Sequence, residues 1–568
     1  MASWNSLPPE IRNQALDQIF QVGKSCNNLA ALATVSREWQ AYMEPRNFRR
    51  LVLNQSSIIH FGQIMRNRKW MVKHIWLRIV LPEYSCSSCT FFEMHRQKQM
   101  NNQMFTNSLF QLLKVLGSWG DRKAYDPIDG TGPLLELSVH SPSDMKHRFD
   151  VCALDKDVYP HTFDENCSRE EFNHHVERIL QKEKKRGQIC QNARGGGIEH
   201  LRMFADIDLD FSAIQYLIEK RLPRVDAIKG LLIRRQYYRA FHPRTVAEIA
   251  RAFQTIDNVT FEPIVRTFRW ADAGLEEGYN ALIREVYRFK SLSIFIGFYS
   301  FDILHEPWKK LSNSFSLRLA DESQHLEHLS SAFAGDGEMF FQDFLQPGSK
   351  NYRPYLDPSR PAVQNVLLER LSIAQRVRLS RLHPREEFEQ ALLKATGYED
   401  GLIPRSVYKP HWLKLNTLAL GSKFDNRHDL FEAAGFAALE MPELQTMEIW
   451  NEDLVLDVFE YFRYSRNDEE AEGSSTITWD SVYEEAPKQR VINAWNRVAK
   501  MRSNQCIEVI VPPPREGRKL PAYPYGVLEY LKLREKIANP ISLRELEWYS
   551  DGWSRRLDQN TQTYTFVP

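Results

Sequence analysis

The sequence predicts an α/β protein in which a small N-terminal module of three short helices precedes a long array of alternating strands and helices. Two patterns lead to this expectation. Apolar residues recur at helical spacing through the first fifty or so residues, and the pattern apolar-x-x-apolar-x-apolar recurs about every thirty residues through the remainder. A chain of 568 residues is too long for one compact core, so an elongated repeat array or several domains are expected.

The composition is that of a folded chain with balanced charge. Apolar residues make up 43% and charged residues 26%, and 74 Lys and Arg against 73 Asp and Glu leave a formal net charge of +1. This balance argues against a nucleic-acid or membrane-surface binder, which normally carries a basic excess. The seven scattered cysteines are typical of a reducing compartment. Since no secretory signal or membrane span is visible, we expect a cytoplasmic or nuclear protein.

The first fifty residues carry the apolar spacing of short helices. The first helix is expected to begin at the segment Leu7–Ile11, because prolines are tolerated in the first turn and Glu10 is favourable near the positive end of the helix dipole. The apolar positions that follow are Leu16, Ile19, Leu29, Leu32, Val35 and Trp39. Helices this short bury little by themselves, so these side chains either pack on the rest of the chain or contact a partner.

Residues 1–53 resemble an F-box, whose pattern begins Leu-Pro-x-Glu and continues with Leu-x-x-Val-Ser-x-x-Trp. Both elements occur here, at Leu7–Glu10 and at Leu32–Trp39, although the first loop, residues 21–28, is longer and more polar than is typical. The resemblance implies docking onto a Skp-family adaptor and, through it, onto a cullin–RING ubiquitin ligase. It also implies that Trp39 closes the core of the module. The residues that it assigns to adaptor docking are Leu7, Pro8, Ile11, Leu16, Leu29, Leu32 and Val35.

The recurring apolar pattern, as in Val72, Ile75 and Leu77, predicts a series of buried strands in residues 54–568. Intervals between neighbouring central residues are close to thirty: Leu201 and Leu231 are 30 residues apart. The predicted strands centre on Ile75, Leu137, Leu201, Leu231, Val259, Leu292, Leu329, Leu418, Met447, Val509 and Leu546. Helical patterns separate several of them, so stacked strand–helix units with a curved parallel sheet are expected.

This array resembles an irregular leucine-rich-repeat solenoid. The Asn or Cys that usually follows the strand is replaced, for example by Asp206 and Gln236, so irregular turns are expected. Polar or proline-rich insertions are predicted near residues 121–170, 335–384 and 463–478, the last as the best candidate for disorder. A non-solenoid α/β fold with a mixed sheet is the alternative. Together with the N-terminal module, the combination resembles fungal F-box proteins.

Short motifs that would indicate chemistry are incomplete. Cys86 and Cys89 have zinc-ligand spacing, but no second pair completes four ligands. The run Lys182–Arg186 could be a nuclear import signal or a solvated helix end, and Arg194–Gly197 lacks the Lys-Ser or Lys-Thr of a phosphate loop. We therefore predict no catalytic residue, no metal and no cofactor. The residues that could bind an acidic protein target, or simply cover the surface, are Arg234, Arg235, Tyr237 and Tyr238.

The sequence thus predicts a non-catalytic substrate-recognition subunit of a Skp–cullin–F-box ubiquitin ligase, which bridges the adaptor and an unknown protein target. Two alternatives remain open. The F-box-like helices could only cap the repeats of a solenoid scaffold, since repeat arrays need capped ends. An enzyme with an unrecognised active site, for example in residues 335–384, would need a pocket with perturbed titratable groups.

Overall fold

In a computed structural model of the protein, the chain folds into two compact units. The first contains residues 1–266, 297–299 and 538–568, and the second contains residues 267–296 and 300–537. The residues that the structure describes are 4–26, 29–88, 91–120, 132–144, 206–214, 220–235, 239–265, 273–298, 306–380, 385–422, 426–453, 458–467, 474–481, 486–512, 526–544 and 546–547. Within them, no helix is long and apolar enough to span a membrane.

The N-terminal module consists of α1 (Pro9–Cys26), α2 (Leu29–Leu32) and α3 (Arg37–Asn47). Helix α1 begins at the predicted prolines but continues through residues 21–26, where a polar loop had been expected. Helix α3 begins after Ser36, whose hydroxyl accepts a hydrogen bond from Trp39 N at 3.3 Å. The Val-Ser-x-x-Trp segment therefore contains the N-cap that starts the third helix.

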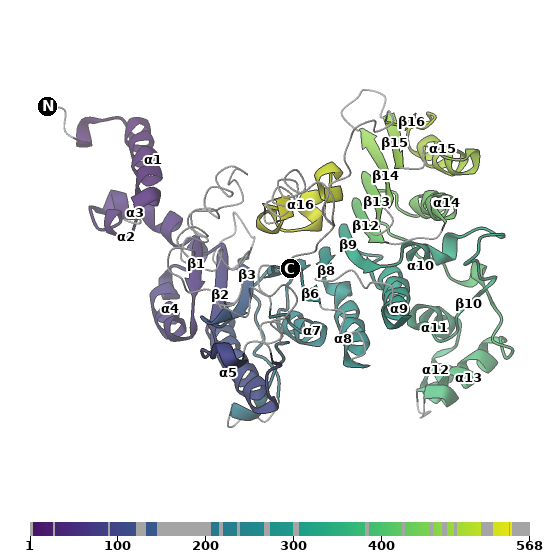
Figure 1. Ribbon diagram of the computed structural model, residues 1–568, viewed down its shortest axis with the longest axis horizontal. Helices are drawn as coiled ribbons and strands as arrows, with labels where there is room; N and C mark the ends of the chain where they lie inside the picture. Colours follow the sequence, from purple (N-terminus) through teal and green to yellow (C-terminus); the bar gives the residue numbers. More distant parts are fainter. Residues whose placement is uncertain are drawn as a thin grey trace. The chain divides into compact units, whose positions relative to one another are not determined.

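The first unit contains a parallel sheet of strands β1 (Arg50–Leu53), β2 (His74–Val80), β3 (Leu134–His140), β4 (Gly230–Ile233) and β5 (Asn258–Phe261), paired in that order. Helices α4 (Ile58–Ile64), α5 (His95–Gly117) and α7 (Pro243–Ala252) lie on one side of these strands (Figure 1). A separate short pair joins β6 (Ile264–Val265) and β8 (Gly297–Phe298). The central residues of two predicted strands, Leu231 and Val259, are direct neighbours in the register.

The second unit contains the parallel strands β7 (Ser291–Phe295), β9 (His328–Gly335), β12 (Thr417–Ser422) and β13 (Thr446–Asp453). Four predicted centres, Leu292, Leu329, Leu418 and Met447, form one row across them and are buried. The helices of this unit include α8 (Ala273–Arg284), α9 (Glu306–Glu322), α14 (Arg427–Ala438), α15 (Gln489–Ser503) and α16 (Arg534–Ile537).

An antiparallel hairpin continues the sheet of the second unit. Strand β14 (Val458–Asn467) pairs with β13 and with β15 (Ser474–Ser481), and β16 (Glu508–Ile510) returns parallel to β15. Residues 463–467 and 474–478 are therefore strand and not the insertion that we predicted. Aromatic residues explain the difference: Phe462, Tyr464 and Trp479 are buried on one face with Trp495 of α15.

The predicted insertion after β9 is folded. It contains α10 (Gly337–Phe340), β10 (Tyr355–Leu356), α11 (Pro361–Glu369), α12 (Ile373–Leu379), α13 (Arg385–Thr396) and β11 (Ile403–Pro404). Strands β10 and β11 pair antiparallel. These elements enclose a separate small core, made of Leu356, Val363, Leu367, Leu371, Leu379, Leu392, Leu393, Ile403 and Tyr408. The segment is thus a small subdomain and not an extended loop.

The structure confirms the α/β class and the mostly parallel arrangement of the strands. One predicted strand is wrong, because residues 540–544, which include Leu543, are helical. The strand predicted at Leu201, the runs 182–186 and 194–197, and residues 121–131 and 145–170 lie outside the described residues.

Candidate functional site

The N-terminal module exposes apolar side chains at several of the predicted docking positions. Ile11 is 46% and Val35 is 59% exposed, and Pro8 is also exposed. Leu7 and Leu32 are half-buried, whereas the side chain of Leu29 lies outside the described residues. Two branched aliphatic side chains are thus available for contact on α1 and on the turn before α3.

Leu16, another of the predicted docking residues, is buried. It is 1% exposed, so it belongs to the core of the module, and its predicted role in adaptor docking is corrected. Trp39 is half-buried, and its ring centroid lies 5.9 Å from that of Trp4. The Trp4 indole donates to Glu38 at 2.8 Å, and Glu38 also pairs with Arg12 of α1 at 2.8 Å. These contacts join η1 (Trp4–Ser6), α1 and α3.

Helix α3 connects the module to the rest of the first unit through its C-terminal half. Met43 is fully buried, and Glu44 accepts two hydrogen bonds from Arg68, at 2.9 and 3.0 Å. Hydrogen bonding from Arg68 lowers the pKa of Glu44, against the opposing effect of burial. The attachment involves α3 and leaves Ile11 and Val35 uncovered.

The predicted target-binding residues at the end of β4 lie inside the fold. Arg234 is 2% exposed; its Nε donates to Glu136 Oε1 at 2.7 Å, and Glu136 also contacts His74 at 2.9 Å. Burial acts to raise the pKa of Glu136, but the charge of Arg234 and the hydrogen bonds with His74 and Arg234 outweigh it and the pKa is lowered. Arg235 is 5% exposed, so the prediction that these two arginines form a binding surface is corrected. Tyr237 and Tyr238 lie outside the described residues.

Each unit also holds a fully buried glutamate that accepts hydrogen bonds from residues near the C-terminal end of the sequence. In the second unit, Glu448 accepts from the backbone N–H groups of Lys532 and Leu533, both at 2.8 Å. In the first unit, Glu262 accepts from Asn539 N at 2.5 Å. Burial raises the pKa of both glutamates, against the hydrogen bonds that favour the charged form. These carboxylates therefore serve to anchor backbone segments.

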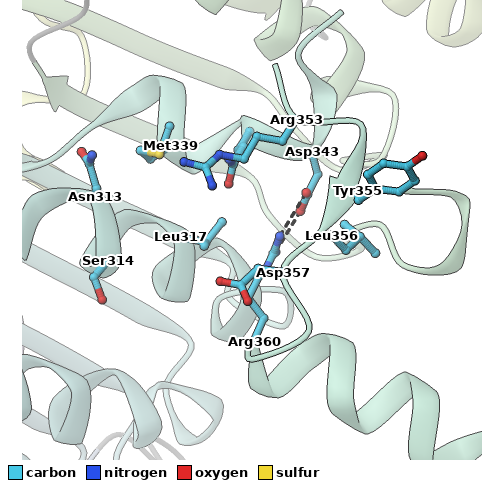
Figure 2. A pocket seen from close by; sticks show the side chains of 11 residues that line it. Asn313, Ser314, Leu317, Met339, Asp343, Arg353, Tyr355, Leu356, Asp357 and Arg360 are labelled. Carbon is cyan, nitrogen blue, oxygen red and sulfur yellow. Dashed lines mark hydrogen bonds and ion pairs between the residues drawn. The ribbon is translucent and has the colours of Figure 1, made fainter. Parts of the chain in front are cut away.

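A cavity of about 200 Å³ lies in the second unit, beside the inserted subdomain (Figure 2). Its lining includes Ser314 and Leu317 of α9, Arg353, and Asp357 with Arg360 before α11. The sequence indicated residues 335–384 as a place where an unrecognised pocket could lie, but none of the residues that line this cavity was predicted, because the prolines of residues 347–361 are typical of an irregular loop. The charged residues that alternate with those prolines were the signal that could have found it.

One side of the cavity is formed by a buried ion-pair network. Arg360 is 5% exposed and bonds two carboxylates: its Nη2 lies 2.5 Å from Asp321 Oδ1 and 2.8 Å from Asp343 Oδ2. Its Nε and Nη1 contact the second oxygens of the same aspartates at 3.2 and 3.0 Å. Tyr408 adds a hydrogen bond to Asp321 at 3.1 Å. Burial raises the pKa of Asp321, although Arg360 counteracts it. The network fixes the start of α11 against α9.

Metal-binding geometry is absent from the described part of the chain, where no three His, Cys, Asp or Glu side chains gather to hold an ion. Cys89, which has zinc-ligand spacing to Cys86 in the sequence, lies outside that part.

Comparison with protein families matches residues 288–539 to a family of unknown function, DUF6546. The matched segment runs from β7 through α16 and so includes the inserted subdomain and its cavity, whereas the N-terminal module lies outside it. Neither the curated proteins nor the solved structures show a significant match to the chain.

Proposed function

We propose that this protein is the substrate-recognition subunit of a Skp–cullin–F-box ubiquitin ligase. In this proposal, α1–α3 dock on a Skp-family adaptor, and the rest of the chain, an irregular leucine-rich-repeat-like array, presents a protein target. The chain supplies no catalytic residue. Other subunits carry the chemistry, and the contribution of this chain is to raise the effective concentration of the target near activated ubiquitin.

The observation that carries the proposal is the exposure of Ile11 and Val35 at F-box-like positions. Full burial of such a side chain is worth about 1.5–3 kcal/mol, so two exposed branched side chains on a small module favour a partner surface. A module that only capped the repeat array would be expected to bury its apolar side chains against that array. Here the burial is concentrated at Leu16 and Met43, on other parts of the module.

The row of aligned apolar residues across β7, β9, β12 and β13 supports the repeat-like part of the proposal. Strands of consecutive repeats should align in this way when strand–helix units stack. The antiparallel β13–β14–β15 segment departs from a regular solenoid, so the repeat interpretation applies best before β14.

Co-purification with a Skp-family adaptor tests the proposal. The native chain is compared with Ile11→Asp/Val35→Asp, in which both exposed side chains become charged. Ile59→Asp is the matched control, because Ile59 is 71% exposed on α4 outside the module. We expect the native chain and the control to retain the adaptor and the double variant to lose it, with melting temperatures unchanged.

The second candidate is a non-catalytic scaffold in which the helices cap the array. The burial of Met43 and the Arg68–Glu44 ion pair favour it, because they attach α3 to the rest of the first unit. A well-folded native chain that does not bind the adaptor would exclude the ligase proposal and favour the scaffold.

A further inference from the structure

The cavity in the second unit is lined by two opposite charges that do not pair with each other. Arg353 is exposed and makes no hydrogen bond or ion pair with any residue in the described part of the chain. Asp357 Oδ1 accepts from Ser359 N at 2.9 Å and from Ser359 Oγ at 2.7 Å, which leaves Oδ2 without a donor among the same residues. Figure 2 shows both charged groups directed toward α9, the helix that carries Leu317.

The other charged groups beside the cavity are already paired with one another. Arg360 uses all three of its nitrogens on Asp321 and Asp343, so neither its guanidinium nor these carboxylates compete strongly for Arg353 or Asp357. A guanidinium binds a carboxylate bidentately, and a carboxylate binds an ammonium group through charge-assisted hydrogen bonds. A ligand that carries both groups would pair with Arg353 and Asp357 at once.

The volume of the cavity and the residues that line it indicate the class of ligand that fits. The cavity of about 200 Å³ is smaller than the roughly 300–1,000 Å³ of usual drug-sized sites, so it suits a molecule of one amino acid and not a nucleotide. Leu317, Met339 and Leu356 provide apolar contacts for an aliphatic side chain. Because Asp343 is paired with Arg360, a phosphate dianion would meet a single available cation, Arg353, beside the carboxylate of Asp357, and is disfavoured.

We propose that this cavity binds a small zwitterion, a free aliphatic α-amino acid. Arg353 holds its carboxylate, Asp357 holds its ammonium group, and Leu317 and Met339 contact its side chain. The Arg360–Asp321–Asp343 network fixes the segment before α11 that carries Asp357. This proposal goes beyond the ubiquitin-ligase proposal and does not depend on it, because binding to the cavity needs no adaptor.

Isothermal titration of the full chain with L-leucine and L-methionine tests the site. The matched probes are N-acetyl-L-leucine, which lacks the ammonium group, and L-leucine methyl ester, which lacks the carboxylate. We expect each to bind at least about tenfold more weakly than L-leucine, since each loses one charge-assisted contact.

Variants assign the two contacts. Arg353→Gln should weaken the binding of L-leucine at least about tenfold, and this variant should bind L-leucine no more tightly than its methyl ester. Asp357→Asn should bind L-leucine no more tightly than N-acetyl-L-leucine. Arg378→Gln, an exposed arginine on α12 outside the cavity lining, should bind as the native chain does. Both substituted residues of the site are exposed, so unchanged melting temperatures are expected.

The proposal is overturned if neither amino acid binds the native chain up to about 10 mM. It is also overturned if the methyl ester and N-acetyl forms bind as well as L-leucine, or if Arg353→Gln and Asp357→Asn bind like the native chain. Loss of adaptor binding in the separate co-purification would leave these results unchanged.

Discussion

The buried network around Arg360 allows a stability prediction with a defined size. In Arg360→Met the side chain keeps much of its apolar volume but loses the charge and all four hydrogen bonds to Asp321 and Asp343. The two carboxylates, whose side chains are 3% and 8% exposed, would then face each other without a cation. Removal of one partner from a buried ion pair costs about 3–5 kcal/mol, because an uncompensated charge stays buried.

Thermal unfolding of the full chain measures this loss. For a folding unit of this size, 3–5 kcal/mol corresponds to a fall of roughly 6–20 °C in the melting transition of the second unit. The matched control is Arg353→Met, since Arg353 is exposed and its substitution should change stability by less than about 0.5 kcal/mol. Hydrogen exchange along α11 locates the effect, because Arg360 precedes that helix.

Two further results decide whether charge is the cause. The triple variant Arg360→Met/Asp321→Asn/Asp343→Asn should recover most of the lost stability, since no buried charge remains. The stability of the single variant should also come closer to that of the native chain as the pH falls, because burial raises the pKa of Asp321 and its protonation removes one of the buried charges. A loss below about 1 kcal/mol in Arg360→Met, or a triple variant less stable than the single one, would refute the argument.

Three other substitutions or conditions have expected outcomes. Gly421→Ala should destabilise the second unit by about 1–3 kcal/mol in urea unfolding, because the new Cβ would lie 2.6 Å from the buried ring of Trp450; an unchanged midpoint would contradict this. Leu16→Ala should cost about 2–5 kcal/mol, whereas Ile11→Ala on the same helix should cost less than about 0.5 kcal/mol; equal melting temperatures would count against the assigned core. Because the pKa of Glu136 is lower in the folded chain than in the unfolded chain, ionised Glu136 stabilises the fold at pH values above its unfolded pKa of about 4.3. This stabilisation is lost as the pH falls through the pKa of Glu136 in the folded chain. Glu136→Gln should therefore lose less stability on acidification than the native chain.

The strands of the parallel sheet could be predicted because their signal is local and repeated. Leu292, Leu418 and Met447 each stand at the centre of an apolar triplet, and a strand buried by helices needs such a triplet wherever it occurs. Leu546 shows the limit of the pattern: spacing of three and two residues also fits one face of a helix, and residues 540–544 are helical.

The antiparallel hairpin was missed because two signals conflict in one segment. The acidic and small residues of 468–475 indicate a loop, whereas alternating aromatic residues in the flanks indicate strands. Tyr464 and Trp479 are buried against α15, so tertiary packing decides the conformation of the flanks.

The site residues were harder to predict than the strands. Arg234 looked like a surface cation because arginine is usually exposed, but its partner Glu136 is 98 residues away in the sequence. Arg353 and Asp357 come together with α9 only through folding of the insertion. Such long-range pairing has no periodic signal in a single sequence.

The anchoring of Glu262 and Glu448 has a consequence for biosynthesis. Asn539 is separated from Glu262 by 277 residues, and Leu533 from Glu448 by 85. A growing chain on the ribosome therefore forms the surrounding strands long before the donors of these carboxylates are translated. Contacts of such sequence separation slow folding, because the connecting chain must lose much entropy before they form. These anchors are thus expected to form only once residues 526–542 have left the ribosome, and nascent chains that lack them should depend most on chaperones.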